Sequence, residues 1–238
     1  SGSDKVYQAA FQQSGVIRAQ NLSEMINFAT GFASGRHYSG EPVAIITNAG
    51  GPGIMATDAL EKTGLSLAQL SAATINNLQS SLPPEANTYN PVDILGDALA
   101  DRYGQALNVV LADKQVGAVL VILTPQAMTQ ISETATAVVE AASKSEKLIV
   151  ACFMGKLEVE AGLKILKKAN IPSYRNPEEA VATLKAMAVY AQSRKQLQEQ
   201  KKPAKVSVKR ERVKELLAQE KNRYLIDLEA LAVLAEYG

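Results

Sequence analysis

The stretch Val43 to Leu60, VAIITNAGGPGIMATDAL, decides the fold. Its first five residues are typical of a strand buried on both faces, and a glycine-rich turn then leads into a helix from Gly53. We expect the backbone N–H groups of Gly50, Gly51 and Gly53 to lack intrahelical acceptors, with the positive end of the helix dipole pointing into the turn. A strand, glycine turn and helix of this kind can hold a phosphate group.

Strand-like and helix-like segments alternate along the chain, which predicts a parallel sheet covered by helices on both faces. The expected strands are Val43–Thr47, Leu67–Leu70, Ala118–Leu123, Leu148–Phe153 and Ile171–Tyr174. The expected helices are Gly53–Thr63, Ala100–Ala112, Ala127–Lys144, Val159–Ala169 and Pro177–Ser193. The leading architecture is therefore α/β, a flavodoxin-like doubly wound parallel sheet of about five strands, with flanking N- and C-terminal helices.

Two helices are expected before this unit, at Lys5–Gln13 and Leu22–Ser34. The second has a clear start signal, because Asn21 is followed three residues later by Glu24, the spacing of a capping box. Gly35 is expected to end it.

The last part of the chain has the composition of a linker followed by a helix. Gln196–Arg212 is highly charged and contains Pro203, which indicates a solvated linker. A basic RNA-binding arm is the alternative, although the segment lacks aromatic side chains that stack on bases. Leu225–Tyr237 is predicted to be an apolar helix that stops with the chain, which we interpret as truncation.

Composition narrows the class of protein. The 238 residues are 47% hydrophobic and carry 25 basic and 24 acidic side chains, so a full core is feasible and no overall charge attracts nucleic acid or a membrane. The single cysteine, Cys152, excludes a disulfide framework and suits a reducing cytoplasm. No apolar stretch approaches the ~18 to 20 residues of a membrane span, and the chain does not begin with a signal peptide. We expect a soluble, cytoplasmic protein.

The glycine turn has three competing explanations. Gly51, Gly53 and Ala56 fit the G-x-G-x-x-A pattern of dinucleotide sites. That pattern also needs an acid about 20 residues later to bind the ribose, and Leu65–Ser71 contains neither Asp nor Glu. Dinucleotide binding is therefore disfavoured. A phosphate site and a purely structural turn, in which glycine permits close packing, both stay open.

Two further loops are expected to reach the same edge of the sheet, because doubly wound folds bind ligands beyond the carboxyl ends of their strands. One loop contains Asn90 and Asp93, and the other contains Thr124 and Gln126. Thr124 and Gln126 are the better ligand candidates, because Asp93 would repel an oxyanion and is expected to accept backbone N–H groups within its own loop. An Asx turn or a helix cap explains each loop equally well.

Catalytic and metal-binding groups are scarce. His37 is the only histidine and precedes the first strand, where no partner acid or nucleophile is apparent. One cysteine and one histidine cannot form an ordinary zinc site. Neither a G-x-S-x-G elbow nor a P-loop occurs. We predict no catalytic residue and no metal site in this chain.

Four motifs follow one another along most of the chain: VAIITNAGGPGIMATDALEKTGL, NPVDILGDA, VLVILTPQAMT and IPSYRNPEEAVATLKAM. Together they resemble NDP-forming acyl-CoA synthetases, a family that includes ADP-forming acetyl-CoA synthetases and is related to succinyl-CoA ligase. In that family, acyl-CoA, ADP and phosphate interconvert with carboxylate, CoA and ATP through a phosphorylated histidine. The resemblance therefore implies a ligase that uses CoA, ATP or ADP, and Mg, with no cofactor held by this chain itself.

The resemblance also divides the chain into parts. Residues 1–35 resemble the helical segment that follows the family's phosphohistidine loop, residues 36–195 its second flavodoxin-like domain, and residues 196–238 a charged linker with the start of an ATP-grasp module. The histidine loop itself is missing, and its role does not transfer to His37. The implied partners are the CoA-binding, phosphohistidine and ATP-grasp parts of the same synthetase or a second copy, with no nucleic acid or membrane.

In that family the phosphohistidine lies between two helix ends, and the glycine turn would be one of them. The implied phosphate-facing residues are Asn48, Gly50, Gly51, Gly53, Thr124 and Gln126, with Asn90 and Asp93 in a supporting loop. Two alternatives have different functions. One is a regulatory part of a protein lysine acetyltransferase built on this architecture, and the other is a non-catalytic module that binds a phosphorylated ligand.

Overall fold

The computed structural model describes residues 3–199, 210–219 and 227–236. The chain forms two compact units, Ser1–Lys195 and Gln196–Gly238. Among the residues in those three described ranges, no helix is long and apolar enough to cross a membrane.

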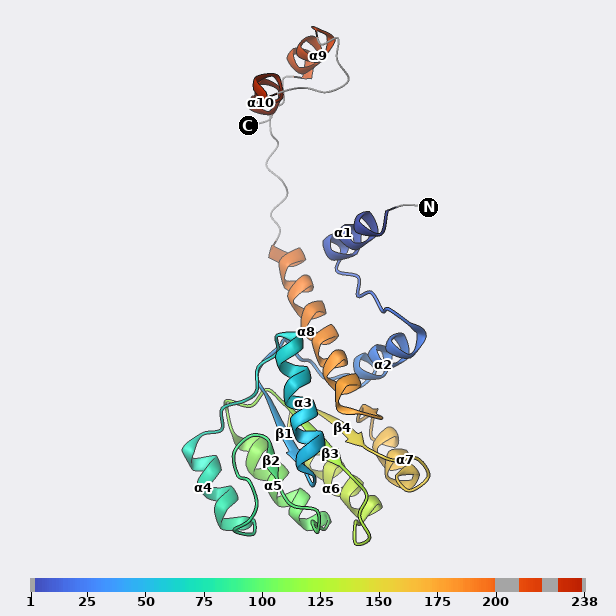
Figure 1. Ribbon diagram of the computed structural model, residues 1–238, viewed down its shortest axis with the longest axis vertical. Helices are drawn as coiled ribbons and strands as arrows, with labels where there is room; N and C mark the ends of the chain where they lie inside the picture. The colour runs from blue at the N-terminus through green and yellow to red at the C-terminus, as the bar shows by residue number, and fades with distance from the viewer. Residues whose placement is uncertain (1–2, 200–209, 220–226, 237–238) are drawn as a thin grey trace. The chain divides into compact units, whose positions relative to one another are not determined.

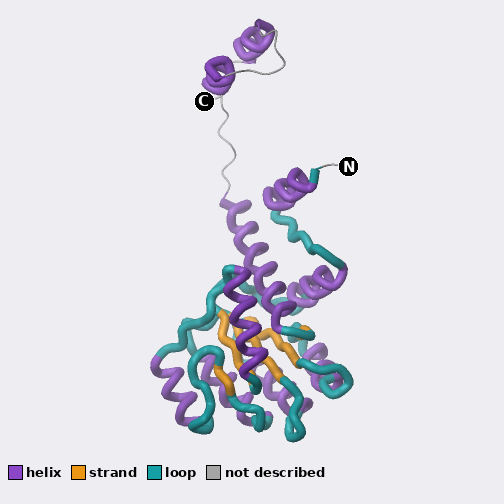
Figure 2. Tube along the Cα trace, viewed as in Figure 1, coloured by secondary structure: helices purple, strands orange, loops and turns teal. Residues whose placement is uncertain are grey.

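A parallel sheet forms the centre of the first unit (Figures 1 and 2). Its strand order is β2-β1-β3-β4-β5, and every neighbouring pair is parallel. The strands are β1 Val43–Thr47, β2 Val92–Asp93, β3 Ala118–Leu123, β4 Leu148–Phe153 and β5 Ser173–Tyr174. This confirms the predicted α/β architecture with helices around a five-stranded parallel sheet.

Helices cover both faces of the sheet, as Figure 1 shows. One face carries α3 Gly50–Thr63 and α8 Pro177–Glu199, and the other carries α4 Ala72–Ser81, α5 Ala100–Ala112, α6 Ile131–Ser143 and α7 Glu160–Lys168. Alternate residues of β1 enter alternate cores: Val43 and Ile45 pack with α3 and α8, and Ala44 and Ile46 pack with the other helices. Burial on both faces explains why β1, β3 and β4 are continuous apolar runs.

The predicted strand Leu67–Leu70 is wrong, and β2 takes its place beside β1. Leu67 makes only an isolated bridge with Val43. Farther along β1, the Asn90 side chain occupies the edge: its Oδ1 accepts the Ile45 N–H at 2.9 Å, and its Nδ2 donates to the Val43 and Ala68 carbonyls at 2.9 Å each. Because this amide uses hydrogen-bonding groups that a second strand would need, pairing resumes only at Val92.

Several element ends differ from the prediction. α3 begins three residues earlier than expected, and α6 begins at Ile131 because Gln126 and Thr129 close a turn ahead of it. α4 was not predicted, although Ser71 gives it a regular cap by accepting the Thr74 N–H. α8 extends to Glu199.

In the second unit, α9 Arg210–Gln219 begins inside the predicted linker, and α10 Asp227–Ala235 confirms the apolar helix predicted near the chain end. Residues 196–199 of the predicted linker are helical, as the end of α8, and residues 200–209 lie outside the described residues.

The two N-terminal helices form close to their predicted positions, as α1 Asp4–Ser14 and α2 Leu22–Phe32. Asn21 caps α2 by accepting the Glu24 N–H at 2.9 Å, as its spacing predicts. Gly31 brings α2 close to α8, because a Cβ at this position would lie 2.3 Å from the Thr183 Cγ2 atom.

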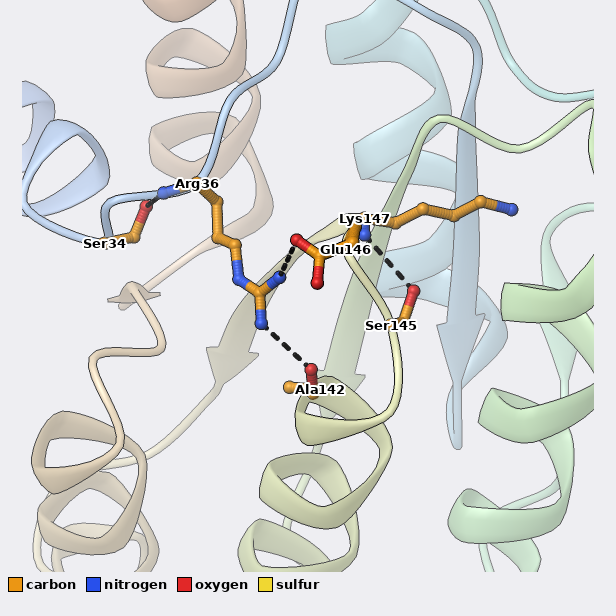
Figure 3. A network of polar contacts seen from close by, with 6 residues as sticks. All are labelled: Ser34, Arg36, Ala142, Ser145, Glu146 and Lys147. Carbon is orange, nitrogen blue, oxygen red and sulfur yellow. Dashed lines mark hydrogen bonds and ion pairs between the residues drawn. The ribbon is translucent and has the colours of Figure 1, made fainter.

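The connector between α2 and β1 is anchored by Arg36 (Figure 3). Its guanidinium donates to the Ala142 carbonyl at 3.1 Å, at the carboxyl end of α6, and pairs with Glu146 at 3.2 Å. A cation at a helix carboxyl end satisfies open carbonyl groups and the dipole. The next residue, His37, is exposed and contacts the Ser39 hydroxyl at 2.9 Å, away from the carboxyl edge of the sheet.

Candidate functional site

The amino end of α3 lies at the carboxyl edge of the sheet, where the strand arrows of Figure 1 point. Its N-cap residue, Ala49, is extended and provides no side-chain cap. Helix geometry leaves the N–H groups of Gly50 and Gly51 without intrahelical acceptors, and Pro52 has no N–H. The Gly53 N–H donates to the Ala49 carbonyl at 3.4 Å, so the expectation of a free N–H at Gly53 is wrong. The helix simply starts earlier than the sequence indicates.

The glycines of this turn differ in what surrounds them. A Cβ at Gly51 would meet no heavy atom within 4 Å, and the residue is exposed. Gly53 is buried, and a Cβ there would lie 3.1 Å from the Thr47 Cγ2 atom and 3.5 Å from the Pro91 Cβ atom. Close packing against the sheet therefore accounts for Gly53, whereas Gly51 faces open space.

Asn48 joins the ends of β1 and β3. It is 2% exposed, its Nδ2 donates to the Thr124 carbonyl at 2.8 Å, and its Oδ1 accepts the Thr124 N–H at 2.8 Å. The hydroxyl of Thr124 is buried, without a hydrogen-bond partner among the residues described. Asn48 thus positions the two loops through a two-bond clamp, and Thr124 does not present its hydroxyl to solvent.

Asp93 ends β2 directly beside the start of α3. Its Oδ1 accepts the Leu95 N–H at 2.9 Å, which confirms the prediction that it bonds within its own loop. A Cβ at Gly50 would lie 3.4 Å from the Asp93 Oδ2 atom. A carboxylate so near a helix amino end is stabilising, but its charge lowers the affinity of the same helix end for a second anion.

The loop that contains Gln126 also reaches the amino end of α3. Gln126 is exposed, and a Cβ at Gly96 would lie 3.9 Å from its Cγ atom and 3.8 Å from the Asn48 carbonyl oxygen. The loops after β1, β2 and β3 therefore converge at α3. Asn90 does not join them, because its side chain is engaged with the backbone of β1 and Ala68.

Sequence reasoning missed Arg102, in the first turn of α5. Its Nη1 donates to the Ile94 carbonyl at 2.8 Å and pairs with Asp97 at 2.6 Å. The hydrogen bond from Arg102 lowers the pKa of Asp97. The sequence signal that could have revealed this contact is an arginine shortly after the acidic residues of the Asp93 loop. Arg102 thus links the first turn of α5 to the loop that follows β2.

The described part of the chain contains no group of three or more His, Cys, Asp or Glu side chains that could hold a metal ion. What the site offers is a pair of backbone N–H donors on a helix end, held by a buried amide clamp and flanked by one carboxylate. Such an arrangement can orient an anion.

A family profile described as "Ligase-CoA domain" matches residues 43–198. The chain belongs to this family. The match includes the sheet and the converging loops, so the Ligase-CoA domain is the unit that carries the candidate site.

Curated relatives of this Ligase-CoA domain are ADP-forming ligases. Acetate–CoA ligase [ADP-forming] I of Archaeoglobus fulgidus is 38% identical over 240 residues, which cover 100% of this chain and 34% of the relative. Acetate–CoA ligase [ADP-forming] II subunit alpha of Pyrococcus furiosus is 37% identical over 198 residues, covering 81% of this chain and 43% of the relative. The chain thus spans about a third to two-fifths of the length of these relatives.

A solved structure shares the fold. The dinucleotide forming acetyl-coenzyme A synthetase 1 of Ca. Korarchaeum cryptofilum, in complex with phosphate and ADP, superposes with a TM-score of 0.78 and 27% identity. The superposition covers 85% of this chain and 44% of that structure. Sequence and structure comparisons therefore agree on ADP-forming acyl-CoA synthetases as the proteins that this Ligase-CoA domain resembles.

Proposed function

We propose that this Ligase-CoA domain supplies one phosphate-facing helix end to an ADP-forming acyl-CoA synthetase. The reaction converts acyl-CoA, ADP and phosphate to carboxylate, CoA and ATP through a phosphohistidine carried by another part of the enzyme. The observation that carries the proposal is the amino end of α3, where Gly50 and Gly51 are exposed and helix geometry leaves their N–H groups without intrahelical acceptors. The ADP-forming relatives and the solved relative with phosphate and ADP support it.

The contribution of this helix end is orientation. One helix end stabilises a nearby anion by about 0.3 to 2 kcal/mol, and N–H bonds to a phosphoryl oxygen are charge-assisted. The Asp93 carboxylate beside Gly50 offsets part of this gain. A phosphoryl group on a histidine is already held by its covalent bond to the protein, so a weak attraction is enough to orient it. A free phosphate ion would depend on this attraction alone for binding.

The remaining site residues have different parts in this proposal. Asn48 and the backbone of Thr124 hold the loops in register, and Gly53 lets α3 approach the sheet. Gln126 has an exposed amide that can donate to the phosphoryl group. Asn90 acts only on the framework, through β1.

Other parts of the synthetase would bind CoA, the adenine nucleotide and Mg²⁺. The proposed partners of this chain are therefore the CoA-binding, phosphohistidine and ATP-grasp domains or subunits of the same synthetase. The relatives are longer than this chain, and one of them is an alpha subunit, which supports partners of both kinds.

Gly51→Val tests the proposal without disturbing the domain. A Cβ at Gly51 meets nothing within 4 Å, so the variant should fold, while its branched side chain obstructs the helix end. In an enzyme reconstituted with the missing parts, acyl-CoA-dependent ATP formation should fall about 5- to 30-fold, the equivalent of losing ~1 to 2 kcal/mol of stabilisation.

The matched control is Ala73→Val. Ala73 is exposed at the second position of α4, as Gly51 is in α3, but α4 starts at the opposite edge of the sheet, where the Ser71 N–H donates to Asp113. This variant should retain full activity. If Gly51→Val forms ATP as fast as Ala73→Val, the helix end does not face the reacting phosphoryl group.

A further inference from the structure

The two carboxylate oxygens of Asp93 have different surroundings. Oδ1 accepts the Leu95 N–H at 2.9 Å, which holds the side chain in one orientation. Oδ2 forms no hydrogen bond or ion pair with any residue in the described part of the chain. The arginine of the neighbouring helix, Arg102, is engaged by the Ile94 carbonyl and by Asp97. Oδ2 is therefore a charged acceptor that can take a further hydrogen bond.

This oxygen lies beside the open end of α3. A Cβ at Gly50 would lie 3.4 Å from the Asp93 Oδ2 atom. Because a Cβ and the backbone nitrogen are bonded to the same Cα, Oδ2 lies within about 6 Å of the Gly50 nitrogen. An oxyanion that accepts this N–H at about 2.9 Å can place a second oxygen about 2.6 Å from Oδ2. One tetrahedral anion can thus contact the helix end and the carboxylate together.

A carboxylate at this distance distinguishes anions by their protons. Near neutral pH inorganic phosphate keeps at least one P–OH proton, which it can donate to a carboxylate. Sulfate has the same tetrahedral shape as phosphate but no proton at this pH. The negative charge of Asp93 repels both ions, and only phosphate gains a hydrogen bond in return. A site that pairs with a hydroxyl group in this way rejects an analogue that lacks the group.

We propose that Asp93 selects phosphate over sulfate at the amino end of α3. Its Oδ2 accepts the P–OH hydrogen bond, while the N–H groups of Gly50 and Gly51 donate to other oxygens of the same ion. The inference rests on the proposed phosphate-facing role of α3 and specifies its ligand as the protonated phosphate ion that enters from solution. Since sulfate keeps the full repulsion from Asp93, it cannot compete effectively for the helix end.

Inhibition of ATP formation tests this selectivity in the synthetase reconstituted with its missing parts. The measured quantity is the ratio of the sulfate inhibition constant to the KM for phosphate. Asp93→Asn should lower the sulfate inhibition constant by about fivefold or more, because the repulsion disappears. The ratio should fall by about 10- to 100-fold, the effect of losing one hydrogen bond to a charged group.

Two controls separate this effect from a change in folding or in overall charge. Asparagine at position 93 keeps the Oδ1 atom that accepts the Leu95 N–H, so the loop should retain its shape. Asp101→Asn removes an equal charge from the exposed first turn of α5 and should leave the ratio unchanged. Arsenate and selenate repeat the comparison with larger ions, because arsenate keeps a proton and selenate does not. Arsenate should therefore inhibit the wild type more strongly than selenate.

The role of Asp93 is overturned if Asp93→Asn changes the ratio no more than Asp101→Asn does, or if arsenate and selenate inhibit the wild type equally. Gly51→Val in the same assay shows which proposal has failed. If Gly51→Val lowers ATP formation while Asp93→Asn leaves the ratio unchanged, only the selectivity of Asp93 is refuted. If Gly51→Val has no effect, the helix end does not face phosphate, and the proposed function is refuted together with this inference.

Discussion

Replacing Asn48 by alanine should weaken the first unit strongly although it removes only one polar side chain. Two hydrogen bonds of 2.8 Å disappear, and the Thr124 N–H and carbonyl lose the partner that joins β3 to β1. Asn48 is 2% exposed, so water reaches these groups poorly. Leaving a buried polar group unpaired costs about 1 to 3 kcal/mol. Because Thr124 is half-buried, about 1 to 2 kcal/mol applies to each of its two groups, which together predict a loss of about 2 to 4 kcal/mol.

Urea and thermal unfolding, followed by circular dichroism, measure this loss. For a unit of nearly 200 residues, about 2 to 4 °C of Tm correspond to each kcal/mol, so Tm should fall by about 5 to 15 °C. Asn108→Ala is the control, because Asn108 is exposed on α5, where alanine favours the helix slightly. The amide resonances of Gly50 and Gly51 should also shift in Asn48→Ala. A loss below about 0.5 kcal/mol, the usual range for surface changes, would refute the clamp.

Three further predictions concern packing, protonation and thiol chemistry. Gly53→Val should destabilise the first unit by about 1 to 3 kcal/mol in urea, because its Cβ alone would lie 3.1 Å from a β1 side chain. Burial acts to raise the pKa of Asp113, but hydrogen bonds from the N–H groups of Gln115 and Ser71 and from the Thr74 and Ser71 side chains together outweigh it and hold the pKa below its usual value. The stabilisation from Asp113 is therefore present above its pKa in the unfolded state and is lost as pH falls through its pKa in the folded state. Acid should lower the Tm of the wild type more than that of Asp113→Asn. Parallel curves of Tm against pH for the two proteins would contradict this. Burial raises the pKa of Cys152 to about 12, so iodoacetamide at mildly alkaline pH should alkylate it only after unfolding, as mass spectrometry would show.

The buried strands were predictable because their physics is local. β1, β3 and β4 are continuous apolar runs bounded by turn residues, and the structure has them at the predicted residues. The segment Leu67–Leu70, LAQL, lacks the Val and Ile of those runs, and although it buries Ala68 and Leu70 it is not a strand. Burial alone does not make a strand. Its pairing with β1 stops at the bridge between Leu67 and Val43, because the Asn90 amide bonds to the backbone of β1 beyond that point. A hydropathy pattern does not reveal such a contact.

The candidate site was predictable in its location and less so in its roles. Alternation of strands and helices indicates which loops share the carboxyl edge, and Asp93 could be assigned to its own loop from its residue type. The different environments of Gly51 and Gly53 could not be predicted. They depend on the distance from each Cβ position to the sheet, and this distance is set by how α3 packs.

Strand register explains how these loops form one site although long stretches of sequence separate them. Thr47 at the end of β1 pairs with Asp93 in β2 and with Ile122 in β3, so all three strands end at nearly the same level. Since parallel neighbours lie about 4.8 Å apart, the loops that follow are brought within one or two side-chain lengths of α3. The Asn48 clamp spans the β1–β3 step of this register and does not touch the open helix end. A change at Asn48 should therefore alter the site by moving its loops, and a change at Gly51 should alter it by occupying its space.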